Sequence, residues 1–165
     1  MAKKKAYLIV SDGNFILTFQ GGSAAGKNRT GNHLPGGTFY PTKTSIGGER
    51  FAGPETLEDR ISAELKEETG FAFDRAAGSI SDFEMLLDGT SVTFMVQKVP
   101  DVEGSPYWRD PFVTPPTIDP DDTPFTSLKK YRIEDCKVGK GIFQIIQGTD
   151  WFAKGVEEAV KRGLI

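Results

Sequence analysis

The chain has 165 residues, of which 38% are hydrophobic and 26% are charged, so it is long enough for one domain with one hydrophobic core. Its formal net charge of −3 lacks the positive excess that is typical of proteins that bind a nucleic-acid duplex. Its single cysteine, Cys136, and single histidine, His33, exclude an internal disulfide, a cysteine-rich metal site and a zinc site with several histidines.

The N-terminal part of the sequence predicts a β-hairpin followed by loops. Residues 6–10 and 15–19 are apolar runs on either side of four turn-forming residues, which is typical of two antiparallel strands. The first run is too short for a signal peptide or a membrane span, so we expect a cytoplasmic protein that does not bind membranes. Residues 21–37 are rich in Gly, Ser and Asn and predict a long loop, residues 38–40 a short strand, and residues 41–53 a second loop.

Residues 56–69 predict the most regular helix of the chain. The segment has no Pro or Gly, and Leu57, Ile61 and Leu65 repeat at four-residue spacing, as on one face of an amphipathic helix. Gly70 follows as a natural helix stop.

The C-terminal part predicts strands, an irregular segment and a closing helix. Strands are expected near residues 71–73, 83–87, 91–99 and 131–133. Residues 100–124, called the excursion below, hold seven of the ten prolines and predict irregular structure. A second helix is expected over about 150–162. Together these elements predict an α+β fold arranged as an α/β/α sandwich, with a mixed central sheet between two helices.

One side of the helix over 56–69 carries three carboxylates. At about 100° per residue, and with Leu57 at zero, Glu68 falls near ~20°, Glu64 near ~340° and Glu67 near ~280°. These three residues are called the acidic flank below. Glu64 and Glu68 border the apolar stripe, although charged side chains normally lie on the opposite side of an amphipathic helix. Crowded carboxylates beside a core repel one another and lose hydration, and Mg²⁺, which prefers oxygen ligands, removes that penalty. An ordinary acidic surface helix is the alternative, and charge alone does not decide between them.

The spacing resembles the Nudix box, Gly-x5-Glu-x7-Arg-Glu-U-x-Glu-Glu-x-Gly-U, in which U is a bulky apolar residue. Residues 64–71 (ELKEETGF) match its end, and Glu55 lies at the required distance before them. Residues 34–37 (LPGG) are similar to the lead-in loop of that family. The motif covers about a quarter of the chain, and the family order of hairpin, loop, acidic helix, strands and closing helix covers nearly all of it.

Two positions depart from the box. Ala63 stands where the box has arginine, and Arg60, one helical turn earlier, falls near ~300° on the acidic flank and is the expected substitute. The box glycine is displaced as well, because Gly48 stands one residue too far from the box glutamate and Gly37 stands much further away. Residues 38–53 are therefore expected to form an enlarged loop.

The resemblance implies a hydrolase that depends on Mg²⁺, with Mn²⁺ as a substitute. Its substrate would be a nucleoside diphosphate linked to another moiety (a nucleotide sugar, ADP-ribose, a dinucleoside polyphosphate or a nucleoside triphosphate), and it would release a nucleoside monophosphate. Glu64, Glu67 and Glu68 would be metal ligands, and a backbone carbonyl around Gly37 would complete the site. The metal would neutralise the diphosphate and activate a water molecule.

The resemblance also implies catalytic roles for Glu67, Glu68 and Arg60, with Glu67 as the first choice for the general base. Glu55 would pair with the arginine, support the ions or contact the substrate. The alternative bases, all in the excursion, are Glu103, Asp119, Asp121 and Asp122.

Residues 21–28 (GGSAAGKN) nearly match a phosphate-binding P-loop, Gly-x4-Gly-Lys-[Ser/Thr]. Asn28 replaces the hydroxyl residue, however, and the glycines and proline that follow prevent the helix that a P-loop needs. We therefore expect a flexible loop in which Lys27 or Arg29 contacts a substrate phosphate. His33 is expected either to contact substrate or to be structural, and the structural role is favoured.

The sequence leaves three functions open. Hydrolysis is favoured, a Nudix-fold nucleotide-binding module without catalysis is second because the box arginine is absent, and a P-loop phosphotransferase is third. The insertions over 38–53 and 100–124 predict either a shaped pocket for a small-molecule nucleotide or the contact of a homodimer. Residues 107–109 (YWR) are expected either to stack on a base or to pack under the excursion.

Overall fold

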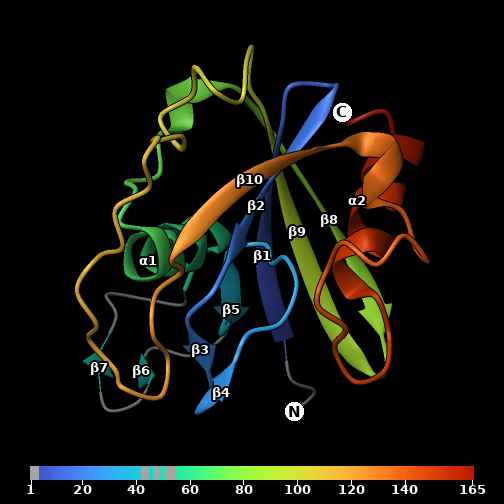
Figure 1. The fold of residues 1–165 in the computed structure, drawn as a ribbon. Helices are drawn as coiled ribbons and strands as arrows, with labels where there is room; N and C mark the ends of the chain where they lie inside the picture. Colours follow the sequence, from blue (N-terminus) through green and yellow to red (C-terminus); the bar gives the residue numbers. More distant parts are fainter. Residues whose placement is uncertain (1–3, 42–44, 47–48, 51–54) are drawn as a thin grey trace.

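The computed structural model describes residues 4–41, 45–46, 49–50 and 55–165, and it places a mixed sheet between two helices (Figure 1). The sheet order is β10-β2-β1-β9-β8, and β5 pairs with β1 beside this path. The strands of this sheet are β1 (Lys4–Ser11), β2 (Phe15–Gln20), β5 (Gly36–Thr38), β8 (Ser79–Leu87), β9 (Thr90–Lys98) and β10 (Ser127–Arg132). Short hairpins are formed by β3 (Ser23–Ala24) with β4 (Lys27–Asn28), and by β6 (Ser45–Ile46) with β7 (Glu49–Arg50). The helices are α1 (Leu57–Thr69) and α2 (Trp151–Lys161), with 3₁₀ turns η1 (Arg75–Ala77) and η2 (Ile133–Cys136).

The central strand β1 is buried on both of its faces. Successive side chains of a strand point to opposite faces of the sheet. Leu8 packs in one hydrophobic cluster with Ile61 and Leu65 of α1. Ile9 packs in a second cluster with Phe152 of α2. The two helices therefore cover opposite faces of the sheet (Figure 1), which confirms the predicted sandwich.

Residues 33–38 insert between β1 and β2. The two strands are joined by a tight turn and pair near it, with β1 running parallel to β9 along its other edge. Further from the turn, His33 pairs with Phe19 of β2, and β5 pairs with β1 so that Gly36 lies opposite Tyr7. A Cβ at Gly36 would collide with the backbone of β1, so only glycine allows this close approach. The inserted segment packs against Glu64 and Glu68 of α1.

Helix α1 has a capping motif at each end. Thr56 is the N-cap and forms a capping box with Asp59, in which each side chain accepts a hydrogen bond from the other residue's amide. Gly70 ends the helix in the left-handed region, with φ 80°, and its amide donates to the carbonyl oxygen of Lys66. The helix predicted over 56–69 is therefore confirmed, and its last turn is fixed in position.

The excursion over 100–124 is irregular, as predicted, and both of its ends are anchored. Near its start, Val102 is fully buried, and its amide donates to the carboxylate of Asp12 at 3.2 Å. Just after its end, the amide of Phe125 donates to the carbonyl oxygen of Glu68 at 2.9 Å. The excursion thus leaves the sheet, passes the end of α1 and returns to β10.

The strand expected over 71–73 was a wrong prediction. Directly after the helix, the amide of Phe71 donates to the hydroxyl of Thr69 at 3.1 Å. Phe71 and Phe73 carry their rings into the cluster beneath α1, so their alternation reflects anchoring in the core and not pairing with a strand. Tyr107 is likewise fully buried, with its hydroxyl 2.7 Å from Oε1 of Gln97, which excludes it from stacking on a base.

The expected loops differ in detail. The short strand predicted over 38–40 begins earlier, as β5, because the two glycines pair with β1. The loop over 21–37 contains the β3–β4 hairpin in place of a P-loop helix. Within the enlarged loop, residues 42–44, 47–48 and 51–54 lie outside the described residues, and Gly48 is among them. No helix in the described part of the chain is both long and apolar enough to cross a membrane.

Candidate active site

Glu68, in the last turn of α1, is bound by donors from two other segments. Its Oε1 accepts a hydrogen bond from the Gly36 amide at 2.8 Å, and its Oε2 accepts one from Nη2 of Arg29 at 3.1 Å. The side chains of Arg29 and Glu68 are only 3% and 11% exposed, so this ion pair is nearly dry. Arg29 also donates to the carbonyl oxygen of Thr123 at 2.8 Å and lies 4.2 Å from the ring centroid of Phe125.

Arg60 bridges Glu55, which precedes α1, and Glu64, which lies within it. Its Nη2 is 2.6 Å from Oε1 of Glu55, and its Nη1 is 2.8 Å from Oε1 of Glu64. The Glu55 side chain is 1% exposed, and it also accepts a hydrogen bond from the Tyr40 amide at 2.9 Å. Ala63, at the position of the box arginine, is exposed. Both Nε and Nη2 of Arg60 donate to Oε1 of Glu55, so an arginine one helical turn before the box position binds this glutamate.

The inserted loop also approaches Glu64. A Cβ built on Gly37 would lie 2.5 Å from Oε1 of Glu64, which is closer than real side chains come. Glycine at this position leaves room for the carboxylate against the backbone. Glu64, Glu68 and the backbone of Gly36 and Gly37 thus meet between α1 and the sheet.

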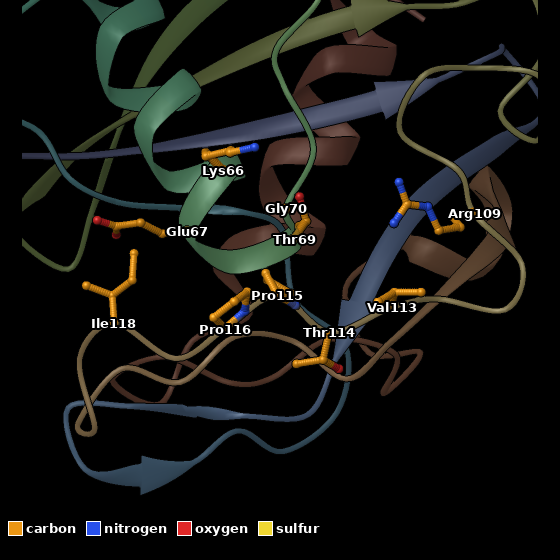
Figure 2. Close-up of a pocket in the computed structure, with 10 residues that line it drawn as sticks. All are labelled: Lys66, Glu67, Thr69, Gly70, Arg109, Val113, Thr114, Pro115, Pro116 and Ile118. Carbon is orange, nitrogen blue, oxygen red and sulfur yellow. The ribbon is translucent and has the colours of Figure 1, made fainter.

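Glu67 lies outside this buried group. Its side chain is exposed and lines a groove of about 550 Å³ at the end of α1. It also lines an adjoining cavity of about 100 Å³ with Asp119 and Asp122 of the excursion. In Figure 2 its carboxylate points away from the helix above Ile118. Glu67 is therefore the member of the acidic flank that is open to solvent and to a bound molecule.

The buried carboxylates are poorly compensated in spite of their arginines. Burial raises the pKa of Glu64 to about 7; Glu67 adds to this rise, and Arg60 opposes it. Burial also raises the pKa of Glu68 well above its usual value; Glu64 contributes to the rise, and Arg29 opposes it. Both groups therefore resist carrying a negative charge, and an additional cation beside them would relieve that cost.

The donor set fits a hard divalent cation, although the expected three-acid cluster is not formed. Among the described residues, no three Asp, Glu, His or Cys side chains gather as a ligand group. Glu64 and Glu68 turn towards the inserted loop, whereas Glu67 turns towards solvent. Their oxygens, and the backbone at Gly37, are nonetheless of the type that Mg²⁺ and Mn²⁺ bind. These residues would hold the ion.

Comparison with known proteins identifies the architecture. A scan against protein-family models and a search of curated proteins found no match. Among solved structures, a NUDIX hydrolase from Nitrosomonas europaea is similar, with a TM-score of 0.51 and 12% identity over 99% of this chain and 90% of that chain. The chain has the Nudix fold.

A larger protein contains the same fold. The bifunctional NMN adenylyltransferase/ADP ribose pyrophosphatase of Francisella tularensis, complexed with AMP and a manganese ion, matches with a TM-score of 0.53 and 15% identity. The match covers 98% of this chain and 42% of that chain. Two solved structures thus superpose on nearly the whole of this chain, although this chain matches less than half of the larger one.

Three residues expected to contact substrate lie in different surroundings of this Nudix fold. Lys27 is exposed in the β3–β4 hairpin. Arg29 is instead buried against Glu68, and no sequence pattern could have revealed this pairing, because 39 positions separate the two residues. His33 is 8% exposed, and its ring centroid lies 4.6 Å from that of Phe152. Burial lowers the pKa of His33 to about 4, so His33 belongs to the core.

The alternative bases of the excursion are not equally placed. Asp119 and Asp122 line the small cavity beside Glu67, and Asp122 also accepts a hydrogen bond from the Ala25 amide at 2.8 Å. Glu103 is paired instead with Lys130 of β10 at 3.1 Å. The carbonyl oxygen of Asp121 accepts a hydrogen bond from the Gly26 amide at 2.8 Å. Asp119 and Asp122 are therefore the excursion acids that share a cavity with the acidic flank.

Proposed function

We propose that the chain is a Nudix-type pyrophosphohydrolase that cleaves a nucleoside diphosphate linked to another moiety and releases a nucleoside monophosphate. The observation that carries this proposal is the buried pair Glu64 and Glu68, pressed against the two glycines of the inserted loop. Burial raises the pKa of both carboxylates, and residues with strongly perturbed pKa values are typical of functional sites. The names of the similar structures, a NUDIX hydrolase and an ADP ribose pyrophosphatase with AMP and manganese, support the same reaction class.

In this proposal the residues of the buried group act by position. Arg60 fixes Glu64, and Arg29 with the Gly36 amide fixes Glu68, so that both carboxylates are held against the inserted loop. A bound Mg²⁺ or Mn²⁺ would neutralise the diphosphate and lower the pKa of a water molecule there. Glu55 supports the group through Arg60 and does not itself reach solvent.

Glu67 is the proposed general base. It is the exposed member of the flank, it lies beside the two buried acids and it faces the groove, so it can accept a proton from a water that attacks phosphorus. Asp119 and Asp122, which share its small cavity, are the alternatives.

A nucleotide-binding module without catalysis is the competing function, since Ala63 replaces the box arginine. The decisive assay incubates the protein with ADP-ribose, UDP-glucose, a dinucleoside polyphosphate and a nucleoside triphosphate, with Mg²⁺ or with a chelator. Hydrolysis predicts release of a nucleoside monophosphate that disappears with the chelator. Binding without turnover of any of these compounds would support the module.

The first prediction concerns Glu67. Glu67→Gln keeps the shape of the side chain but cannot accept a proton, so kcat should fall by roughly 10² or more, the usual contribution of a general base. Steady-state kinetics of nucleoside monophosphate release checks this. The matched control is Glu58→Gln, which alters a partly exposed acid of the same helix that pairs with Arg75 at 3.0 Å and which should leave kcat unchanged. Undiminished turnover in Glu67→Gln would shift the role to Asp119 or Asp122.

A further inference from the structure

A groove beside the acidic flank is lined largely by residues that the proposed reaction does not use. Its volume of about 550 Å³ is in the range of small-molecule sites. The end of α1 forms one wall, and residues 113–118 of the excursion form the other (Figure 2). Glu67 lies at one end of the groove and Arg109 at the other. A molecule bound in the groove would therefore extend from the acidic flank towards Arg109.

Two cations without carboxylate partners line this groove. Within the part of the chain that the structure describes, neither Lys66 nor Arg109 makes an ion pair or a side-chain hydrogen bond. Four other arginines, in contrast, are paired with carboxylates, namely Arg29, Arg60, Arg75 and Arg162. The guanidinium carbon of Arg109 lies 5.8 Å from the ring centroid of Phe71, and in Figure 2 the group points into the groove. Its planar set of N–H donors is suited to a carboxylate or a phosphate.

The facing wall is apolar and rigid. Val113 and Ile118 are 57% and 79% exposed although both are apolar, and exposed apolar side chains that line a groove are typical of a binding surface. Pro115 and Pro116 lie between them, and the fixed φ of proline restricts the backbone of this wall. Among the described residues that line the groove, Glu67 is the one carboxylate. The groove therefore offers an apolar surface, a cationic end and a link to the acidic flank.

We propose that this groove binds the second moiety of the substrate and selects a moiety that carries its own phosphate or carboxylate. The inference rests on the proposed function, because Glu67 connects the groove to the site of hydrolysis. With the diphosphate beside the acidic flank, the second moiety lies against the proline wall, and its anionic group is bound by Lys66 and Arg109.

The test compares substrates that differ by one anionic group. NADP and NAD form one pair, and UDP-glucuronate and UDP-glucose form another; within each pair the diphosphate is the same. The protein should have a higher kcat/KM for the anionic member of at least one pair. Arg109→Gln and Lys66→Gln should each reduce that preference roughly tenfold, the contribution of one charge-assisted hydrogen bond, by raising KM for the anionic member more than KM for the neutral member.

The matched control is Arg162→Gln. Arg162 also lies over an aromatic ring, 5.0 Å from the centroid of Phe83, but it belongs to the end of α2 and is paired with Glu158. This variant should keep the preference of the wild type. An unchanged preference in both Arg109→Gln and Lys66→Gln would overturn the inference.

Binding separates failure of the inference from failure of the proposed function. If no compound is hydrolysed, the proposed function fails, but calorimetric titration of the same four compounds in the presence of Mg²⁺ still tests the groove. Tighter binding of the anionic member, lost in Arg109→Gln, supports the groove as an anion-selective site. Equal dissociation constants within both pairs in the wild-type protein would overturn it.

Discussion

At the scale of single residues, His33 shows how burial makes stability depend on pH. Burial lowers its pKa from 6.5 to about 4. Between these pH values His33 is protonated in the unfolded chain and neutral in the folded chain. Above pH 6.5, where His33 is neutral in both the folded and the unfolded chain, the free energy of unfolding carries no penalty from its protonation. As the pH falls towards 4, the free energy of unfolding decreases, by about 2 kcal/mol at pH 5.

Comparison of the wild type with His33→Gln isolates this effect. Burial raises the pKa values of Glu64 and Glu68, so these groups also make stability depend on pH, but they do so in both proteins and their contributions cancel in the difference. Urea unfolding at pH 7.5 and pH 5 should show that the stability advantage of the wild type over the variant shrinks by about 2 kcal/mol. A difference that stays constant with pH would contradict a buried neutral imidazole.

The acidic flank was predictable at this scale, and its partners were only partly so. Helical angles place Glu64, Glu67 and Glu68 on one side and put Arg60 among them, and the structure has Arg60 bound to Glu64. The pairing of Arg29 with Glu68 joins residues 39 positions apart, so it cannot be predicted from local residue spacing. A contact of this kind follows from topology and not from periodicity.

At the scale of elements, the capping box of α1 makes a measurable contribution. In Thr56→Ala, the amide of Asp59 loses the hydroxyl that accepts its hydrogen bond at 3.0 Å. The free energy of unfolding should fall by about 1 kcal/mol, the usual cost of losing an N-cap. Chemical denaturation measures this value. The control Ser62→Ala changes an exposed residue of the same helix and should stay within about 0.5 kcal/mol of the wild type.

The helices were predictable almost to the residue because their signals are local. The four-residue apolar spacing and the glycine stop define α1, and an apolar side defines α2. The segment over 71–73 shows the limit of such signals, because alternating aromatic residues look alike whether they pair with a strand or only anchor a chain in the core. The early start of β5 has a similar cause, since its glycines have no strand propensity of their own.

At the scale of the whole molecule, a bound divalent ion should stabilise the fold. An ion that binds only the folded chain adds about 1.4 kcal/mol to the free energy of unfolding when its concentration is ten times its dissociation constant. Thermal unfolding with increasing Mg²⁺ or Mn²⁺ should therefore show a rising Tm. No change in Tm at millimolar concentrations would count against a metal site between α1 and the inserted loop.

Two variants make this measurement specific to the site. Glu64→Gln should lose most of the increase in Tm, because it removes a buried oxygen charge beside Gly37. Glu58→Gln removes a partly exposed acid from the same helix and should keep the increase. The quantity compared is the increment caused by the ion in each protein, since the two substitutions also alter the stability of the metal-free chain.

The layered architecture followed from the sequence, whereas the insertion of residues 33–38 did not. An apolar run over residues 6–10 of the first strand and two helices with one apolar side each predict burial of the sheet on both faces. Nothing in the sequence shows that β1 and β2 give space to a third segment, because the pairing of His33 with Phe19 is a contact between a loop and a strand. That insertion is what brings Gly36 and Gly37 under Glu64 and Glu68.

The two anchored ends of the excursion bear on how relatives of this chain could diversify. Val102 is held by Asp12 at one end and Phe125 by Glu68 at the other, so exposed residues between these points, apart from the buried Tyr107 and the acids Asp119 and Asp122, can be exchanged while α1 and the inserted loop keep their geometry. Natural variation in substrate preference should therefore concentrate between residues 103 and 122. A graft of this stretch would be the simplest way to redesign specificity.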